Sequence, residues 1–263
     1  MDFLLNKWFL KKKQRKINDL PKYMPLQPYR SIHIDELAVP SSIVELFRTA
    51  APTTKFTLFV PIDYLEENDY IQLEMIQHSF SLMVFIRRSN AYPPDVLEHI
   101  QQLFNLVMDS SNCIHIWGNM NNIISTLENL EFFFHDMFHP VHYINIQKQF
   151  KQWYNSTFIH GYYCEQNLKF NTIDGPLCSC SYRPLKTLNE EWTIDQAIAY
   201  TFTEYLNIDI ADNISSNQIC SAISTLSIVL DQQWTREQVQ SYIQAHMNLR
   251  QVNIFYSLLI VYL

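Results

Sequence analysis

Three histidines near the middle of the chain have a spacing that metal ligands use. His135 and His139 stand four residues apart with Asp136 between them, and His142 follows. On a helix, this spacing would put two imidazoles on one face to share a zinc ion, with the acid as general base. Pro140 restricts His139 away from helical geometry. The run of phenylalanines around these histidines favours ordinary packing in the core or at the surface over a zinc site.

A second candidate metal site comes from cysteines. Cys164, Cys178 and Cys180 could hold zinc together with His160. The C-x-C pair, however, differs from the C-x₂₋₄-C spacing of common structural zinc sites. Five cysteines at irregular spacing also do not form the framework of a secreted disulfide protein. We expect free thiols, and no cysteine stands with a histidine and an acid in a pattern typical of a nucleophile.

Cations and aromatic rings alternate in the segment QKQFKQWYN. Lys148, Lys151 and Trp153 combine positive charge with a ring, which is what proteins use to bind single-stranded nucleic acid. The alternative is an amphipathic helix with Phe150 and Trp153 turned inward and the lysines in water, and we favour it. Arginines that could add phosphate contacts are Arg87, Arg88 and Arg183.

The composition excludes several functional classes. The 263 residues include three glycines, too few and too far apart for the glycine-rich loops that cradle nucleotide phosphates. With 48% hydrophobic and 14% aromatic residues, the chain folds rather than remaining disordered. A formal net charge of -7 argues against nucleic-acid binding by bulk charge, so such binding would need a local basic surface.

The two ends of the sequence bear on location. Near the start, an apolar stretch precedes a basic run over residues 11–16, the reverse of a signal peptide. The basic run fits a nuclear-import or nucleic-acid-binding arm, or the solvated helix face that we favour. The final VNIFYSLLIVYL is apolar but shorter than the about 20 residues that span a bilayer. We expect an intracellular protein, nuclear or cytoplasmic, without membrane contact; no protein partner is predicted.

Periodicity predicts an α/β fold. Strands are expected at 55–62, 70–77, 81–88 and 113–119, and helices at 41–50, 93–110, 121–134, 144–158, 192–206, 217–231 and 235–250. Three leading strands can form an antiparallel meander, and the fourth returns parallel through a crossover helix. We expect residues 1–54 to be a loop-rich basic arm with one short helix, and residues 55–263 to be the folded domain.

Three segments carry a family resemblance. Ile71-Gln72-Leu73 matches the core of a family strand, CIHIWGNMNNIISTL a later strand and its helix, and WTIDQAIAYTFTEYL a late helix. Over residues 55–255 the chain resembles the RNase D and Werner-type 3′-5′ exonucleases of the DEDD family. The resemblance implies a ribonuclease H-like mixed β-sheet flanked by helices. It also implies metal-dependent removal of nucleotides from the 3′ end of a single strand.

The family's metal ligands are altered in this chain. The family holds two Mg²⁺ or Mn²⁺ ions with an Asp-x-Glu on the first strand, an Asp after the fourth strand and an Asp on a late helix, which follows a Tyr or His. The first strand here offers Phe59-Val60-Pro61 or, in a shifted register, Asp63 with Glu66 and Glu67 nearby. Asn122 stands at the second position, and Tyr256, with no acid after it, at the third.

These departures predict that catalysis is weakened or lost. If activity survives, the resemblance assigns it to Asp63, Glu66, Glu67, Asn122 and Tyr256, with Asp63 and Asn122 as metal ligands. The alternative is a non-catalytic nucleic-acid or protein interaction module on the same fold, contacting nucleic acid through Lys148, Lys151, Trp153 and Arg87. A third interpretation is a truncated gene product, because the chain stops where the family's late helix would finish.

Overall fold

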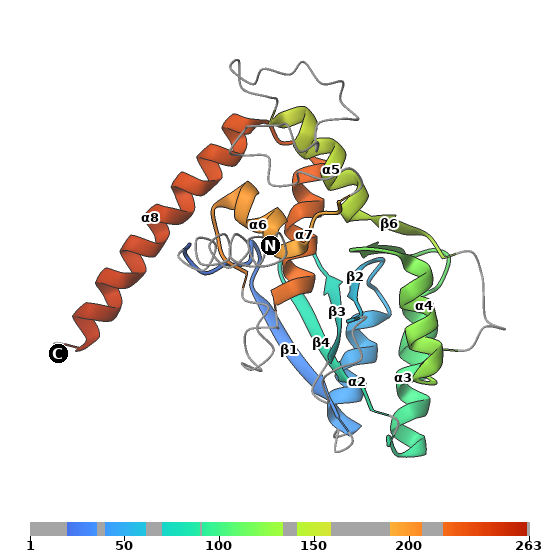
Figure 1. Cartoon of the computed structure of the whole chain (residues 1–263). Helices are drawn as coiled ribbons and strands as arrows, with labels where there is room; N and C mark the ends of the chain where they lie inside the picture. Colours follow the sequence, from blue (N-terminus) through green and yellow to red (C-terminus); the bar gives the residue numbers. More distant parts are fainter. Residues whose placement is uncertain are drawn as a thin grey trace, which may run out of the picture. The chain divides into compact units, whose positions relative to one another are not determined.

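One mixed β-sheet organises the fold (Figure 1). The computed structural model describes residues 20–35, 40–61, 70–89, 91–133, 141–158, 190–206 and 218–261, without the side chains of 40–42 and 249–261. The described strands are β1 (Tyr29–Ile34), β2 (Lys55–Phe59), β3 (Tyr70–Ile76), β4 (Ser81–Arg87), β5 (Cys113–Ile116) and β6 (Tyr143–Asn145). Their order across the sheet is β1-β4-β3-β2-β5-β6.

Helices follow β1, β4, β5 and β6, and the described part of the chain ends in consecutive helices. The described helices are α2 (Pro40–Ala50), α3 (Pro94–Val107), α4 (Met120–Asn129), α5 (Ile146–Thr157), α6 (Ile194–Phe202), α7 (Ile219–Asp231) and α8 (Arg236–Val261). Every helix predicted from periodicity is present, and α8 runs further than the expected end at residue 250. In the described part of the chain, no helix has the length and apolar character needed to cross a bilayer.

The strand directions confirm the predicted plan. β2, β3 and β4 form an antiparallel meander, and β5 returns parallel to β2 after α3. β6 then adds in parallel to β5. A three-stranded meander extended by parallel strands beside its first strand is the ribonuclease H-like arrangement, so the fold class is α/β with a mixed sheet flanked by helices.

The sheet also contains strands that periodicity did not predict. β1 lies within the segment expected to be loop-rich, yet it pairs in parallel with β4 along its whole length, from Tyr29 opposite Ser81 to Ile34 opposite Ile86. Its residues are mostly exposed and therefore show no alternation of buried and polar positions. The expectation of a loop-rich segment was wrong for residues 29–34, because the partner that makes it a strand is distant in sequence. The expected boundary at residue 55 stays a prediction.

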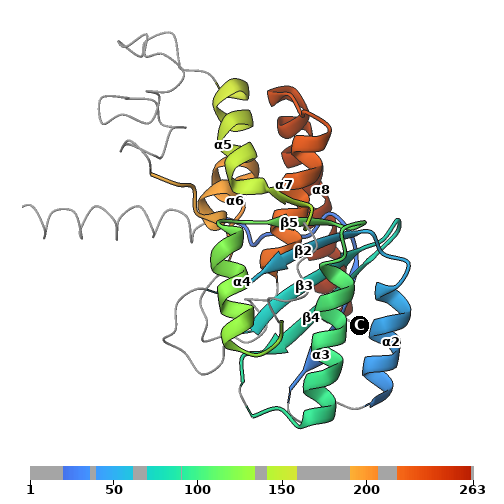
Figure 2. The same ribbon diagram turned by 90° about the vertical axis from the view of Figure 1, so that its right-hand side faces the viewer.

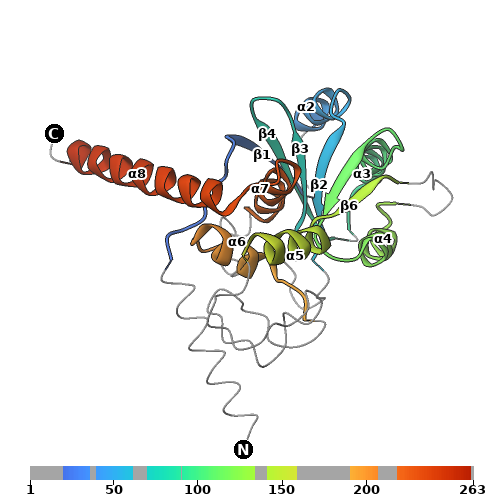
Figure 3. The same ribbon diagram turned by 90° about the horizontal axis from the view of Figure 1, so that it is seen from above.

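The two faces of the sheet differ in chemistry. One face is apolar: Phe56, Leu58, Leu73 and Val84 are fully buried against α2, α3 and α4. Figure 2 shows these three helices in front of the strands, and Figure 3 shows α7 on the other side of the sheet. Alternate residues of a strand point to opposite faces, so the face toward α7 carries the polar Thr57, Gln72 and Glu74. It also carries a smaller apolar cluster of Met83, Phe85 and Cys220. We call this mixed face the polar face, to distinguish it from the wholly apolar one.

Local signals set several helix boundaries. Pro93 is the N-cap of α3 and Pro94 its first residue, where a proline loses no helical hydrogen bond. Before α8, the Thr235 amide donates to Gln238 Oε1 at 2.7 Å and the Gln238 amide to Thr235 Oγ1 at 3.4 Å, which is the predicted capping box. Thr193 is the N-cap of α6 as expected, but its side chain makes no capping hydrogen bond.

The chain divides into two compact units, which we describe separately. Met24–Gln149 and Asn207–Ile228 form the sheet unit, with its flanking helices. The other unit comprises Met1–Tyr23, Phe150–Leu206 and Val229–Leu263. Its described core is aromatic: Phe150 lies 5.2 Å from Trp192, and Tyr154 lies 4.7 Å from Trp192, between ring centroids.

The apolar face of the sheet should carry much of the stability. Leu58 is fully buried in the centre of β2, so Leu58→Ala should lower the free energy of unfolding by about 2–5 kcal/mol. Val44 on α2 is 57% exposed, and Val44→Ala should change it by less than about 0.5 kcal/mol. Urea unfolding of both variants checks this, and equal losses would contradict the assigned core.

Candidate functional site

The carboxyl ends of the parallel strands meet at one edge of the sheet, which we call the carboxyl edge. β1, β2, β4, β5 and β6 all run toward it. In open α/β sheets, ligands bind outside this edge, where loops and helix N-termini gather. The helices α4 and α5 both begin here, directly after β5 and β6.

Asparagine side chains hold the two helix starts at the carboxyl edge. Asn119 Oδ1 accepts from the Asn121 amide at 2.9 Å and caps α4. Asn145 Nδ2 donates to the Gly118 carbonyl at 2.6 Å, and its Oδ1 accepts from the Lys148 amide at 3.0 Å. Gly118 has φ 108°, a left-handed conformation that favours glycine. One asparagine thus ties the β5–α4 corner to the first turn of α5.

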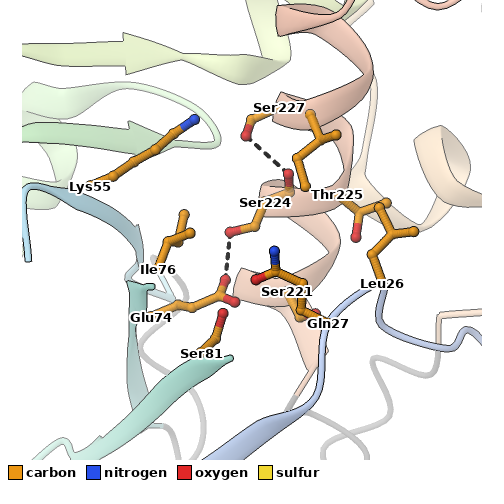
Figure 4. A pocket seen from close by; sticks show the side chains of 11 residues that line it. Leu26, Gln27, Lys55, Glu74, Ile76, Ser81, Ser221, Ser224, Thr225 and Ser227 are labelled. Carbon is orange, nitrogen blue, oxygen red and sulfur yellow. Dashed lines mark hydrogen bonds between the residues drawn. The ribbon is translucent and has the colours of Figure 1, made fainter. Parts of the chain in front are cut away.

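A buried hydrogen-bond network joins the polar face of the sheet to α7 (Figure 4). Ser224 Oγ donates to Glu74 Oε2 at 2.5 Å, and Thr57 Oγ1 lies 2.6 Å from Ser224 Oγ. Since Ser224 gives its proton to Glu74, Thr57 must be the donor to Ser224. Thr57 and Glu74 are direct partners across β2 and β3. The register of the meander therefore places both groups under one serine of α7.

Burial is the largest influence on the pKa of Glu74. The side chain is nearly inaccessible, and burial raises the pKa of its carboxyl group above the ordinary value. Hydrogen bonds from Ser224 and Ser81 lower the pKa of Glu74 and offset part of that rise. The carboxyl group therefore holds its proton to higher pH in the folded chain than in the unfolded chain.

A second set of contacts seats α7 next to this network. Cys220 Sγ donates to the carbonyl oxygens of Gln72 at 3.2 Å and of Thr57 at 3.6 Å. The Cys220 amide donates to Gln72 Oε1 at 3.4 Å. Burial, and then the nearby charge of Glu74, raise the pKa of the Cys220 thiol well above its usual range. Cys220 therefore acts as a neutral thiol donor.

The described residues at the sheet–helix interface do not fit a pair of Mg²⁺ or Mn²⁺ ions. The side chains of β2 on the face toward α7 are Thr57 and Phe59, two residues apart, and Cys220 and Ser224 meet them from α7, four residues apart. None of these four is a carboxylate, the ligand that these hard cations require. Thr57 Oγ1 and Ser224 Oγ contact each other directly at 2.6 Å. Within the described residues, no group of three or more potential metal ligands is found.

Of the sequence-predicted catalytic residues, only Asn122 lies in the part of the chain whose side chains the structure describes. Asn122 is exposed in the first turn of α4, where its amide donates to the Asn119 carbonyl at 3.2 Å. Tyr256 belongs to the part of α8 whose side chains are not described, and Asp63, Glu66 and Glu67 lie outside the described residues. Their catalytic and metal-binding roles stay predictions. Within the sheet unit, the late helix α7 packs on the polar face of the sheet.

The predicted nucleic-acid contacts fall into both units. Arg87 ends β4, and Lys148 is exposed on α5, so both stand at the carboxyl edge of the sheet unit. In the other unit, Lys151 Nζ donates to the Glu190 carbonyl at 3.1 Å. Trp153 is 5% exposed, and its Nε1 donates to the Trp234 carbonyl at 3.0 Å. Lys148 and the buried Trp153 match the amphipathic-helix interpretation of this segment.

Other candidates from the sequence are only partly described. His142 is exposed, whereas His135, Asp136, His139 and the three cysteines grouped with His160 lie outside the described residues. Phe132 and Phe133 are buried in the apolar core, as the aromatic interpretation of that segment predicted.

Sequence reasoning missed the polar network, although it left a trace. Along β3, the apolar Ile71 and Leu73 alternate with Gln72 and Glu74, so both polar side chains must share one face. The hydroxyls of α7 recur at helical spacing, which a search for carboxylates passes over. The partners Glu74 and Ser224 lie 150 residues apart, and neither segment alone indicates the other.

Two solved structures are similar to this chain at low sequence identity. The crystal structure of the Nibbler EXO domain of Aedes aegypti is similar over 85% of this chain and 99% of that domain, with a TM-score of 0.44 and 10% identity. Escherichia coli RNase D, an exoribonuclease involved in structured RNA processing, is similar over 79% of this chain and 51% of that protein, with a TM-score of 0.26 and 13% identity. No protein-family model and no curated protein matches the sequence.

The hydrogen bonds of Ser224 should contribute measurably to stability. Ser224→Ala leaves Glu74 and Thr57 without this buried partner, and should lower the free energy of unfolding by about 1–3 kcal/mol. Ser125 is exposed on α4, and Ser125→Ala should change it by less than about 0.5 kcal/mol. Urea unfolding compares the two variants, and similar losses would argue against the network.

Glu74 should make the stability depend on pH with a definite sign. Its folded pKa lies above its unfolded value, so the folded chain keeps a proton that the unfolded chain releases. The free energy of unfolding should therefore fall as pH rises from about 4.5 toward the folded pKa. Glu74→Gln removes this component, so its stability relative to the parent chain should rise over that range. Urea unfolding at several pH values in tetramethylammonium buffer measures this, and parallel pH profiles would contradict it.

Proposed function

We propose that this chain is a ribonuclease H-like domain of the 3′-5′ exonuclease type that binds single-stranded nucleic acid at its carboxyl edge without cleaving it. The observation that carries the proposal is the direct Thr57–Ser224 hydrogen bond, at the interface where this fold would need acidic metal ligands. Two-metal phosphodiester hydrolysis requires carboxylates that hold both ions around the reacting phosphate. The described side chains that meet there are hydroxyl, thiol and phenyl groups, and the one carboxyl group beside them, Glu74, accepts a hydrogen bond from Ser224.

The carboxyl edge keeps features that suit phosphate contacts. Arg87 closes β4, and Arg88 Nη1 donates to the Pro61 carbonyl at the end of β2, at 3.2 Å, so two guanidinium groups accompany these strand ends. Lys148 is exposed in the first turn of α5. The N-termini of α4 and α5 add partial positive charge toward the same edge. These groups provide the local basic surface that a chain with net charge -7 would need.

The first test separates binding from cleavage. The full chain is incubated with Mn²⁺ and a 5′-labelled single strand, and the length of the strand and its binding are both measured. We expect no shortening, and an affinity that falls as salt rises, because phosphate contacts release bound counterions. Shortening that Asp63→Asn abolishes would overturn the non-cleaving proposal and support a site built from residues 63–67.

Charge variants locate the contact surface. Arg87→Ala and Lys148→Ala should each reduce the slope of log affinity against log salt by about 1, with little dependence on nucleotide sequence. Arg48 is an equally simple control, because it is exposed near the end of α2, at the opposite edge of the sheet, and Arg48→Ala should leave the slope unchanged. Absence of salt-sensitive binding would refute the proposal and leave the protein interaction module as the interpretation.

A further inference from the structure

A small cavity adjoins the buried carboxyl group of Glu74 on the side away from the carboxyl edge. Its volume is about 30 Å³, enough for one or two water-sized groups. Lys55 begins β2, Ile76 ends β3 and Ser81 begins β4, so the cavity lies at the opposite edge of the sheet. Figure 4 shows Ser224 of α7 directed at Glu74, and Ser227 directed at Ser224. The whole cavity belongs to the sheet unit.

Oxygen atoms dominate the polar part of the wall. Besides Glu74, the wall contains hydroxyl side chains from β4 and α7. They are Ser81, Ser221, Ser224, Thr225 and Ser227. Gln27 contributes an amide, and the apolar remainder comes from Leu26, Ile76 and Ile228. The polar part of the wall thus combines one carboxyl group and several hydroxyls with the ammonium group of Lys55.

The hydroxyl protons are largely committed to protein acceptors. Ser224 gives its proton to Glu74, and Ser227 donates to the Ser224 carbonyl at 2.9 Å. Ser81 also hydrogen-bonds to Glu74. A hydroxyl that has donated its single proton offers only lone pairs to other groups, and a carboxylate has about four acceptor positions, of which two are used here. These groups therefore present acceptors to the cavity, which suits a positive guest better than an anion.

The size and charge of the cavity indicate which class of cation it could bind. Divalent cations of the hard class select sites with several carboxylates, whereas this wall carries one. A monovalent cation balances one carboxylate and can complete its coordination with neutral hydroxyl oxygens. We propose that this cavity is a binding site for Na⁺ or K⁺, with Glu74 as the charged ligand and Ser81, Ser224 and Ser227 supplying neutral oxygens.

Cation binding would offset the cost of burying Glu74. An ionised carboxylate inside a protein is costly unless a positive partner accompanies it. Lys55 lines the same cavity, and its ammonium group is a like charge to the guest and a competitor for the carboxylate. Because the site lies at the edge opposite Arg87 and Lys148, the inference does not depend on nucleic-acid binding, and either can fail while the other holds.

The test compares salts at equal ionic strength, so that general screening cancels. The thermal midpoint of the full chain is measured at pH 8 in NaCl, KCl and N-methylglucamine chloride, whose cation is too large for the cavity. We expect a saturable rise of a few degrees in Na⁺ or K⁺, because a ligand that binds the folded state stabilises it. Equal midpoints in all three salts, as expected for a cavity that holds water alone, would overturn the proposal.

Three variants assign the effect to the cavity. Glu74→Gln should abolish the salt specificity, whereas Glu98→Gln, at an exposed glutamate of α3, should keep it. Lys55→Met removes the competing ammonium group, and should shift the titration toward lower salt by several-fold. If Glu74→Gln fails to fold, two other measurements still test whether the cavity binds the cation. They are the salt titration of Lys55→Met and the broadening of the sodium NMR line by the parent chain. An unchanged titration in Lys55→Met, or a retained effect in Glu74→Gln, would refute the site.

Discussion

The hydrogen bond from Ser224 to Glu74 constrains how α7 can sit on the sheet. Burying a carboxyl group in a sheet–helix interface costs free energy unless donors meet it with correct geometry. The apolar layer formed with α2, α3 and α4 is tolerant of small shifts, because the hydrophobic effect has no direction. The contact between the polar face and α7 does not tolerate such shifts, because hydrogen bonds depend on direction. A slip of α7 by one residue would remove the partners of Thr57, Glu74 and Gln72 together.

These contacts explain how the described strands and α7 pack around a single buried carboxyl group instead of a set of acidic metal ligands. Uncharged polar groups occupy the interface and hydrogen-bond to one another. The hydroxyls of Thr57 and Ser224 bond to each other, and the Cys220 thiol bonds to two backbone carbonyl oxygens. Four mutually repelling acids would need metal ions to coexist at such a place. Here the described strand and helix touch directly, and the one carboxyl group among these side chains, Glu74, bonds to the same serine and also lines the cavity.

The sequence predicted the strands and helices whose burial repeats with a simple period. Some features can be predicted from a few neighbouring residues. Examples are the apolar residues of β3, the proline pair before α3 and the Thr235–Gln238 cap. β1 and the polar network have no such local signal. β1 becomes a strand because β4 offers an edge, and Ser224 matters because Glu74 lies beneath it. Both depend on partners distant in the chain, and a search for acidic ligands favoured Asp63 and Asn122 over Thr57 and Ser224.

The position of β1 in the sheet has a consequence for the order in which the chain folds. β1 precedes α2 and β2 in sequence, yet the β3–β4 hairpin stands between β1 and β2. Tyr29 finds its partner only when Ser81 is in place, so the earliest strand of the sheet to be synthesised is the one that must wait for the meander. During that interval it is an unpaired, mostly polar segment, and its exposed arginine, serine and histidine oppose pairing with other chains. A nascent chain of this fold thus completes its sheet from the middle outward.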